Sequence, residues 1–186
     1  MRRGWAALLL LLSPAAHAHP QGFHKRVVLN VSLYRIDGLI VLDVDGGERC
    51  RLIRDGADQN RDGKLSGDEV KALEDKLTRM ATRALKLSLS GFGVPPQVKQ
   101  TKLDLRKDHT VSETGVSVAV LLEDPHPAAV AVGTDLLVED SSPDLSPVRF
   151  EVNQITLPDA GLEPPARTEL ESGVKWKVRL GALAAQ

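Results

Sequence analysis

The sequence contains a single cysteine among its 186 residues, so no disulfide can form within the chain. Aromatic residues make up only 3%, and positive and negative side chains nearly balance, with a formal net charge of -1. Nucleic acids and anionic membrane surfaces are normally bound by clustered Lys and Arg, so we expect neither as the main partner. Hydrophobic residues nevertheless amount to 42%, which is enough for a chain of this length to bury a core.

Long apolar runs are absent after the first 18 residues, which have the pattern of a signal peptide. Two arginines precede an apolar run at residues 5–12, which is too short to span a bilayer, and Ala16-His17-Ala18 provides small residues for cleavage. We predict cleavage after Ala18, a secreted or periplasmic location, and no membrane span in the mature chain. The mature chain, residues 19–186, is expected to form a single β-rich domain.

Alternating apolar and polar residues predict several short β-strands. Val27, Leu29 and Val31 alternate with polar residues, and a second alternating run follows Asp37-Gly38, a pair that predicts a two-residue hairpin turn. Further alternating runs occupy residues 85–89, 98–105, 116–122, 134–138, 148–152 and 174–180. The proline-containing segment 157–166 is predicted to be a loop. This pattern predicts an antiparallel β-sandwich or partly closed barrel.

Between the second and third predicted strands, apolar residues recur every three or four positions, as on one face of a helix. A short stripe and a longer one follow each other: Cys50, Ile53 and Ala57, then Val70, Leu73, Leu77, Met80, Ala81 and Ala84. Two helices are therefore predicted to flank residues 58–69, within an insertion that spans about residues 47–86. The expected fold class is α+β, with this helix-loop-helix inserted after the first hairpin.

Residues 58–69, with the sequence DQNRDGKLSGDE, match the twelve-residue calcium-loop pattern D-x-N-x-D-G-x-L-S-x-x-E. Calcium takes about six to eight oxygen ligands, and a loop that winds around the ion offers them at alternate positions. The predicted ligands are the side chains of Asp58, Asn60 and Asp62, the backbone carbonyl of Lys64, Ser66 through a water, and both carboxylate oxygens of Glu69. Gly63 permits the sharp bend, and Leu65 is expected to point into the core. The segment therefore resembles a single EF-hand, with Ca²⁺ as its cofactor.

A second calcium loop is not found in the sequence. Sensor EF-hands work in pairs that open together, so a lone loop favours a structural site of moderate affinity, about 10⁻⁵ to 10⁻³ M. The sequence also contains no nucleophile elbow, no zinc-protease helix and no phosphate-binding glycine loop. We therefore predict a non-enzymatic calcium-binding protein, and the sequence does not identify a protein partner.

The order of the motifs around this loop resembles that of a known family. Ala18-His19-Pro20, a hairpin, the D-x-N-x-D-G loop and a helix that leads to Leu85-Lys86-Leu87 follow one another as in the exported N-terminal portion of hydrogenase/urease accessory-type membrane proteins. The resemblance covers roughly residues 16 to 90. It implies an association with nickel uptake.

A second hypothesis concerns His19, which cleavage after Ala18 would leave at the N-terminus. Its α-amine and imidazole could then bind Cu²⁺ or Ni²⁺, with His24, His109 and His126 as candidate additional ligands. This start is similar to that of periplasmic copper carriers and of copper-dependent polysaccharide oxygenases. The alternative prediction is therefore a periplasmic transition-metal binding or delivery protein that uses His19.

Overall fold

A computed structural model of the chain describes residues 22–31, 35–95, 97–125, 133–141, 148–155, 160–162, 166–170 and 173–182. The predicted signal peptide, its cleavage site and His19 lie outside these residues, as does His126. Among the helices that are described, none combines the length and the apolar character needed to cross a membrane.

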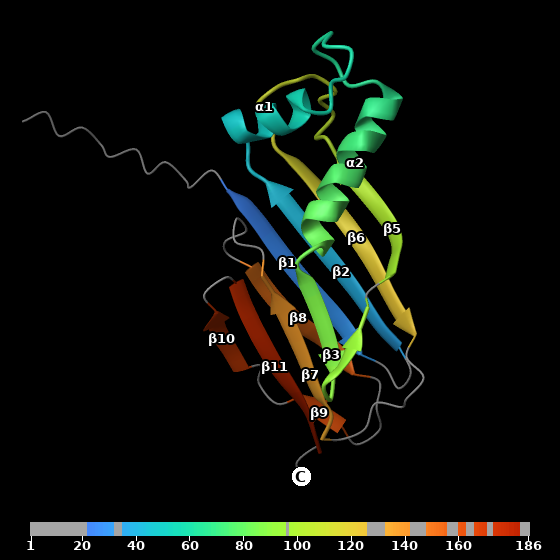
Figure 1. Cartoon of the computed structure of the whole chain (residues 1–186), viewed down its shortest axis with the longest axis vertical. Helices are drawn as coiled ribbons and strands as arrows, with labels where there is room; N and C mark the ends of the chain where they lie inside the picture. Colours follow the sequence, from blue (N-terminus) through green and yellow to red (C-terminus); the bar gives the residue numbers. More distant parts are fainter. Residues whose placement is uncertain are drawn as a thin grey trace, which may run out of the picture.

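The described strands form two sheets (Figure 1). The five-stranded sheet has the order β5 (Gln97–Asp104), β6 (Val116–Pro125), β2 (Arg35–Val44), β1 (Phe23–Val31) and β8 (Val148–Ile155). The six-stranded sheet has the order β10 (Ala166–Leu170), β11 (Gly173–Ala182), β7 (Asp135–Asp140), β3 (Leu85–Leu89) and β4 (Phe92–Val94), while β9 (Ala160–Leu162) pairs with β11. Neighbouring strands are antiparallel except β1 and β8, which are parallel. The predicted α+β class with mainly antiparallel strands is confirmed.

Alternation along each strand corresponds to one buried and one outward face. In β2, Ile36, Ile40, Leu42 and Val44 are buried, whereas Val41 and Asp43, which alternate with the last three, are only partly buried. Buried residues of both sheets and of the two helices belong to one hydrophobic core. The sequence pattern therefore identified most strands correctly, because it reports which face of each strand is buried.

The predicted turn at Asp37-Gly38 is wrong, although β1 and β2 do pair as an antiparallel hairpin. Both residues lie inside β2, where Asp37 pairs with Asn30 and Gly38 pairs with Leu29. Gly38 occupies an inward position, and a Cβ atom there would lie 3.2 Å from the Cβ atom of Leu122 and 3.2 Å from a methyl group of Leu29. This glycine therefore allows close packing within a strand, rather than a positive φ in a turn.

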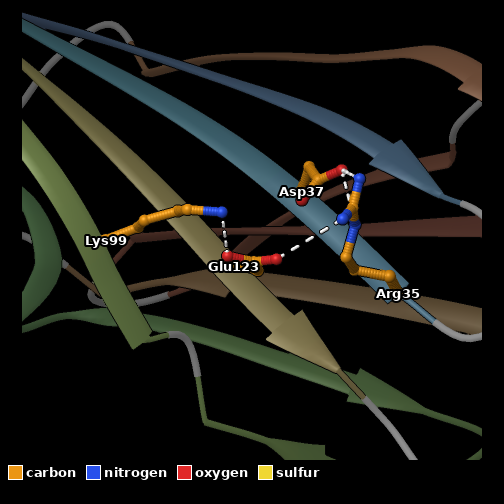
Figure 2. Close-up of polar contacts among 4 residues, drawn as sticks. All are labelled: Arg35, Asp37, Lys99 and Glu123. Carbon is orange, nitrogen blue, oxygen red and sulfur yellow. Dashed lines mark hydrogen bonds and ion pairs between the residues drawn. The ribbon is translucent and has the colours of Figure 1, made fainter.

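Asp37 instead belongs to a group of charged residues that runs across β2, β6 and β5 (Figure 2). Its Oδ2 atom lies 2.8 Å from Nη2 of Arg35, and Nη1 of Arg35 lies 3.4 Å from Oε1 of Glu123. Glu123 also pairs with Lys99 on β5, and these contacts lower the pKa of its carboxyl group, Lys99 most strongly. Exposed pairs of this kind contribute only about 0–1 kcal/mol each, so they affect solubility more than stability.

Three short strands were not predicted. β9 lies within the segment 157–166 that was predicted to be a loop, and β4 and β10 also lie outside the predicted strands. β4 and β9 have three residues each, which is too short for a period of two to be recognised. β4 pairs with the preceding strand β3, and β9 pairs with the end of β11, about 20 residues later.

The two helices, α1 (Glu48–Asp55) and α2 (Gly67–Thr82), lie between β2 and β3 in the chain, as predicted. Ala57 and Ala84, which belonged to the predicted stripes, lie just beyond the helix ends. Leu73, Leu77 and Ala81 are fully buried where α2 packs against β2, β5 and β6. Figure 1 shows α2 lying across the five-stranded sheet and α1 near one end of it, so that residues 58–69 lie at that end of the molecule.

A buried ion pair joins the two sheets. Lys25 on β1 and Asp140 on β7 have side chains with no exposed surface, and the Lys25 ammonium group donates a hydrogen bond to the Asp140 carboxylate. Burial lowers the pKa of Lys25, while the negative charge of Asp140 opposes this change. The contact between the two groups offsets part of the cost of removing each charge from water.

Candidate metal centre

The last two predicted ligands, Ser66 and Glu69, also begin helix α2. Ser66 is the N-cap residue, and its hydroxyl oxygen accepts a hydrogen bond from the Glu69 backbone N–H at 3.4 Å. In return, Oε2 of Glu69 accepts hydrogen bonds from the Ser66 N–H and hydroxyl group, both at 2.8 Å. This reciprocal arrangement is a capping box, which satisfies backbone donors that a helix start leaves unpaired.

Glu69 also connects the two ends of the loop. Its Oε1 atom accepts hydrogen bonds from the backbone N–H groups of Gln59 at 2.8 Å and Asn60 at 3.3 Å. Hydrogen bonds from Ser66, followed by those from Asn60 and Gln59, lower the pKa of Glu69 to about 2. The carboxylate is thus buried in its charged form and held across the loop.

Hydrogen bonds from backbone N–H groups to nearby side chains hold the first half of the loop in its curved shape. Oδ2 of Asp58 accepts the Gly63 N–H at 2.9 Å, and Oδ1 of Asn60 accepts the Asp62 N–H at 2.9 Å. Oδ1 of Asp62 in turn accepts the Lys64 N–H at 2.8 Å. Gly63 has a φ of 79°, a backbone conformation that glycine adopts without a steric penalty. The predicted reason for this glycine is therefore confirmed.

One oxygen atom in the loop has no partner. Oδ1 of Asp58 is buried and accepts no hydrogen bond from the described residues. A buried carboxylate oxygen without a donor costs free energy, unless a cation or a water satisfies it. The oxygen-only donor groups of Asp58, Asn60, Asp62 and Glu69 fit calcium, which prefers hard oxygen ligands.

Most other carboxylate oxygens of the loop already accept hydrogen bonds from backbone and side-chain groups of the loop itself. In the described part of the chain, no group of three or more His, Cys, Asp or Glu side chains lies close enough together to hold a metal ion. Both oxygens of Glu69 accept N–H or O–H groups, and Asp62 accepts the Lys64 N–H and the Asn60 amide. A bound cation would therefore have to compete with some of these hydrogen bonds.

The second half of the loop pairs with the connection between β5 and β6. We call residues 105–114 the pairing segment. Lys64 forms an isolated antiparallel bridge with Thr110 of this segment. Leu65 is buried, as predicted, and packs in the common core. No local pattern in the sequence indicated that the pairing segment would meet the loop.

Arg54, the penultimate residue of α1, is a further residue that the sequence did not point to. Its side chain is fully buried. Its guanidinium group donates hydrogen bonds to four backbone carbonyls of the pairing segment: Asp108 at 2.6 Å, Thr110 at 3.1 Å, Thr114 at 3.2 Å and Leu105 at 3.3 Å. The only available signal was an arginine in the last turn of a predicted helix, which usually indicates a solvated position favoured by the helix dipole.

Asp108 fixes the shape of the pairing segment. Its carboxylate accepts hydrogen bonds from the Ser112 hydroxyl group and from the N–H and hydroxyl groups of Thr110, at 3.0 and 2.6 Å. These bonds, with that from Ser112 the strongest, hold the pKa of Asp108 well below its ordinary value of 3.8. The folded protein therefore binds this proton less tightly than the unfolded chain does.

This difference predicts a pH dependence that Asp108→Asn removes. The stabilisation from the Asp108 carboxylate is complete above about pH 5 and is lost as the pH falls below 3.8. In calcium-free buffer, urea unfolding should show a constant stability difference between wild type and Asp108→Asn from about pH 7 to pH 5, shrinking towards pH 2. A difference that stays constant down to pH 2 would contradict this assignment.

Of the four histidines in the alternative hypothesis, the structure describes His24 and His109. Neither belongs to a group of three or more potential metal ligands among the described residues. Nε2 of His24 lies 2.8 Å from Oδ2 of Asp45, and His109 is exposed in the pairing segment. The hypothesis about His19 concerns a residue outside the described part and stays a prediction.

No protein-family model matches this chain, and no curated protein matches it either. The resemblance of residues 58–69 to an EF-hand and that of residues 16–90 to accessory-type membrane proteins therefore gain no support from a relative. Any function assigned to the chain rests on the chemistry of its own residues.

Proposed function

We propose that this protein binds one calcium ion in the loop formed by residues 58–69, and that the ion has a structural, non-catalytic role in an exported protein. The residues that would hold the ion are Asp58, Asn60, Asp62, Lys64 through its carbonyl, Ser66 and Glu69. The observation that carries the proposal is the buried Oδ1 atom of Asp58, which has no donor among the described residues. A bound calcium ion would be the partner of this oxygen atom and would neutralise part of the negative charge of the neighbouring carboxylates.

The position of the loop supports a structural role. It joins α1 to α2, and α2 packs against three strands of the five-stranded sheet. A cation held between residues 58 and 69 would fix the two helices relative to each other and therefore relative to this sheet. On this proposal the chain is an EF-hand inserted into a β-sandwich. The signal-peptide pattern of residues 1–18 supports an exported location, where calcium at about 1 mM is compatible with a moderate-affinity site.

Calorimetric titration with calcium of the wild type and Glu69→Gln tests the proposal. Glutamine can keep the capping box with Ser66, because Gln also serves at this helix position, but it removes the negative charge. We expect one site per wild-type chain and a reduction of calcium affinity in Glu69→Gln by at least about 10- to 100-fold, the range seen when even an outer partner of a metal ligand is lost.

Asp68→Asn is the matched control. Asp68 lies in the same loop beside Glu69 and is exposed, but the calcium-loop pattern does not use it as a ligand. We expect its affinity to stay within about threefold of the wild type, since only a screened surface charge changes. Equal loss of binding in both variants, or equal binding by wild type and Glu69→Gln, would overturn the assigned site.

A further inference from the structure

The pairing segment is bonded directly to the proposed calcium loop. The Leu65 N–H donates to the His109 carbonyl at 2.7 Å, and the Val111 N–H donates to the Gly63 carbonyl at 3.0 Å. These bonds connect the middle of the loop to a part of the chain that lies more than 40 residues later. A change in the shape of the loop must therefore alter these bonds or move the pairing segment with it.

The same segment is bonded along the length of α1, the helix that enters the loop. The Gly47 N–H donates to the Glu113 carbonyl at 2.8 Å, and Sγ of Cys50 donates to the Thr114 carbonyl at 3.0 Å. Arg54 follows Cys50 by one helical turn and donates to the four carbonyls given above. Gly47, Cys50 and Arg54, which are spaced three and four residues apart, thus donate hydrogen bonds from one face of the helix to backbone carbonyls of the pairing segment.

Arg54 forms hydrogen bonds with both the calcium loop and the pairing segment. Its backbone carbonyl accepts the N–H of Asp58, the first residue of the loop, at 3.1 Å, while its side chain binds the pairing segment. A planar guanidinium group with five N–H donors suits this task, because it can satisfy several carbonyls in fixed directions. The pairing segment contains two consecutive residues with positive φ, Arg106 at 52° and Lys107 at 63°, a shape that needs such external support.

We propose that Arg54 is a positioning residue for the calcium loop, and that the pairing segment is the part of the protein that becomes more rigid when calcium binds. This inference rests on the proposed function. Sensor EF-hands are supported by a second EF-hand, whereas here the pairing segment supports a lone loop. Coupling between ion and segment is reciprocal: calcium stabilises the bonds to the segment, and a fixed segment increases calcium affinity.

Amide hydrogen exchange of the wild-type protein, with and without saturating calcium, measures this coupling. We expect the amides of Leu65 and Val111 to exchange at least about tenfold more slowly with calcium. The internal control is the Ser90 amide, which donates to the Asp135 carbonyl at 2.8 Å in the turn between β3 and β4, and its exchange should change far less. Glu69→Gln, whose calcium affinity should be lower, should show much less slowing of the Leu65 and Val111 amides than the wild type at the same calcium concentration.

Arg54→Lys tests the positioning role. Lysine keeps the positive charge, but one ammonium group cannot reach all four carbonyls. We expect calcium affinity to fall by at least about tenfold, and the calcium-dependent slowing at Val111 to be lost even at calcium concentrations that calorimetry shows to be saturating. A purely structural role would instead raise exchange with and without calcium alike and leave the calcium-dependent change intact.

The outcomes separate the two proposals. If wild-type protein binds calcium at the loop but the Val111 amide is unaffected, the coupling is overturned and the proposed function stands. If wild-type protein shows no binding heat, the proposed function fails and the coupling fails with it. If Arg54→Lys folds and retains both affinity and slowing, Arg54 has no positioning role; if it does not fold, the wild-type exchange decides whether the segment responds to calcium.

Discussion

Replacing Lys25 with methionine is expected to lower the free energy of unfolding by about 3–5 kcal/mol. The substitution removes the ammonium group that contacts the buried carboxylate of Asp140, and breaking a buried ion pair by removing one partner is costly. Methionine is close to lysine in length, so loss of packing adds little. Urea unfolding followed by circular dichroism measures the difference.

Two further variants show whether the charge is the cause. Lys25→Met/Asp140→Asn also removes the buried charge of Asp140 and should recover part of the lost stability. Lys99→Met removes an exposed partner of Glu123 and should cost no more than about 1 kcal/mol (Figure 2). If Lys25→Met were no more destabilising than Lys99→Met, the buried pair would not contribute to joining the sheets.

Removing calcium is the second change with a large expected effect. At a calcium concentration about a hundred times the dissociation constant, binding to the folded state alone adds about 2.7 kcal/mol of stability. For a domain of about 150–250 residues, this corresponds to a rise of about 5–11 °C in the midpoint of thermal unfolding. Differential scanning calorimetry in calcium and in excess chelator measures the shift.

Glu69→Gln provides the reference for this experiment. Its midpoint should rise much less, because an affinity about 10- to 100-fold lower leaves only about 0.4–1.4 kcal/mol of stabilisation at the same calcium concentration. Magnesium at equal concentration should shift the wild type less, since Mg²⁺ demands a tight octahedral site and gives up its water reluctantly. An equal calcium shift in wild type and Glu69→Gln would mean that the ion stabilises the fold from another place.

Features that repeat along the chain could be predicted from the sequence. The alternation of Ile40, Leu42 and Val44 identified a strand, and the spacing of Leu73 and Leu77 identified a helix, because burial of one face imposes a period. The order of the elements, with two helices between β2 and β3, followed directly from these periods. The parallel pairing of β1 with β8 could not be predicted from these periods, since pairing partners are set by tertiary packing.

Single residues whose role depends on a distant part of the chain were predicted poorly. Asp37-Gly38 has the composition of a hairpin turn, yet Gly38 lies inside a strand, where a Cβ atom would lie only 3.2 Å from Leu122 of the neighbouring strand. Lys25 occupies an alternating strand position, and only the opposite sheet supplies Asp140. Local composition carries no information about such contacts.

The candidate site divides in the same way. The ligand residues were predicted because the calcium loop is contiguous, so that its spacing alone brings Asp58, Asp62 and Glu69 into one segment. The surroundings of the loop were not predicted. No sequence pattern singled out Arg54, and its four carbonyl partners come from a segment that is brought to it by the pairing of β5 with β6.

A crystal structure determined in millimolar calcium tests the central claim most directly. The account predicts one ion enclosed by residues 58–69, with oxygen ligands at about 2.3–2.6 Å from Asp58, Asn60, Asp62, the Lys64 carbonyl and both oxygens of Glu69. Oδ1 of Asp58, which lacks a partner among the described residues, should be one of the ligand atoms. A structure in which this loop remains free of metal while calcium is bound elsewhere in the protein, or nowhere, would contradict the account.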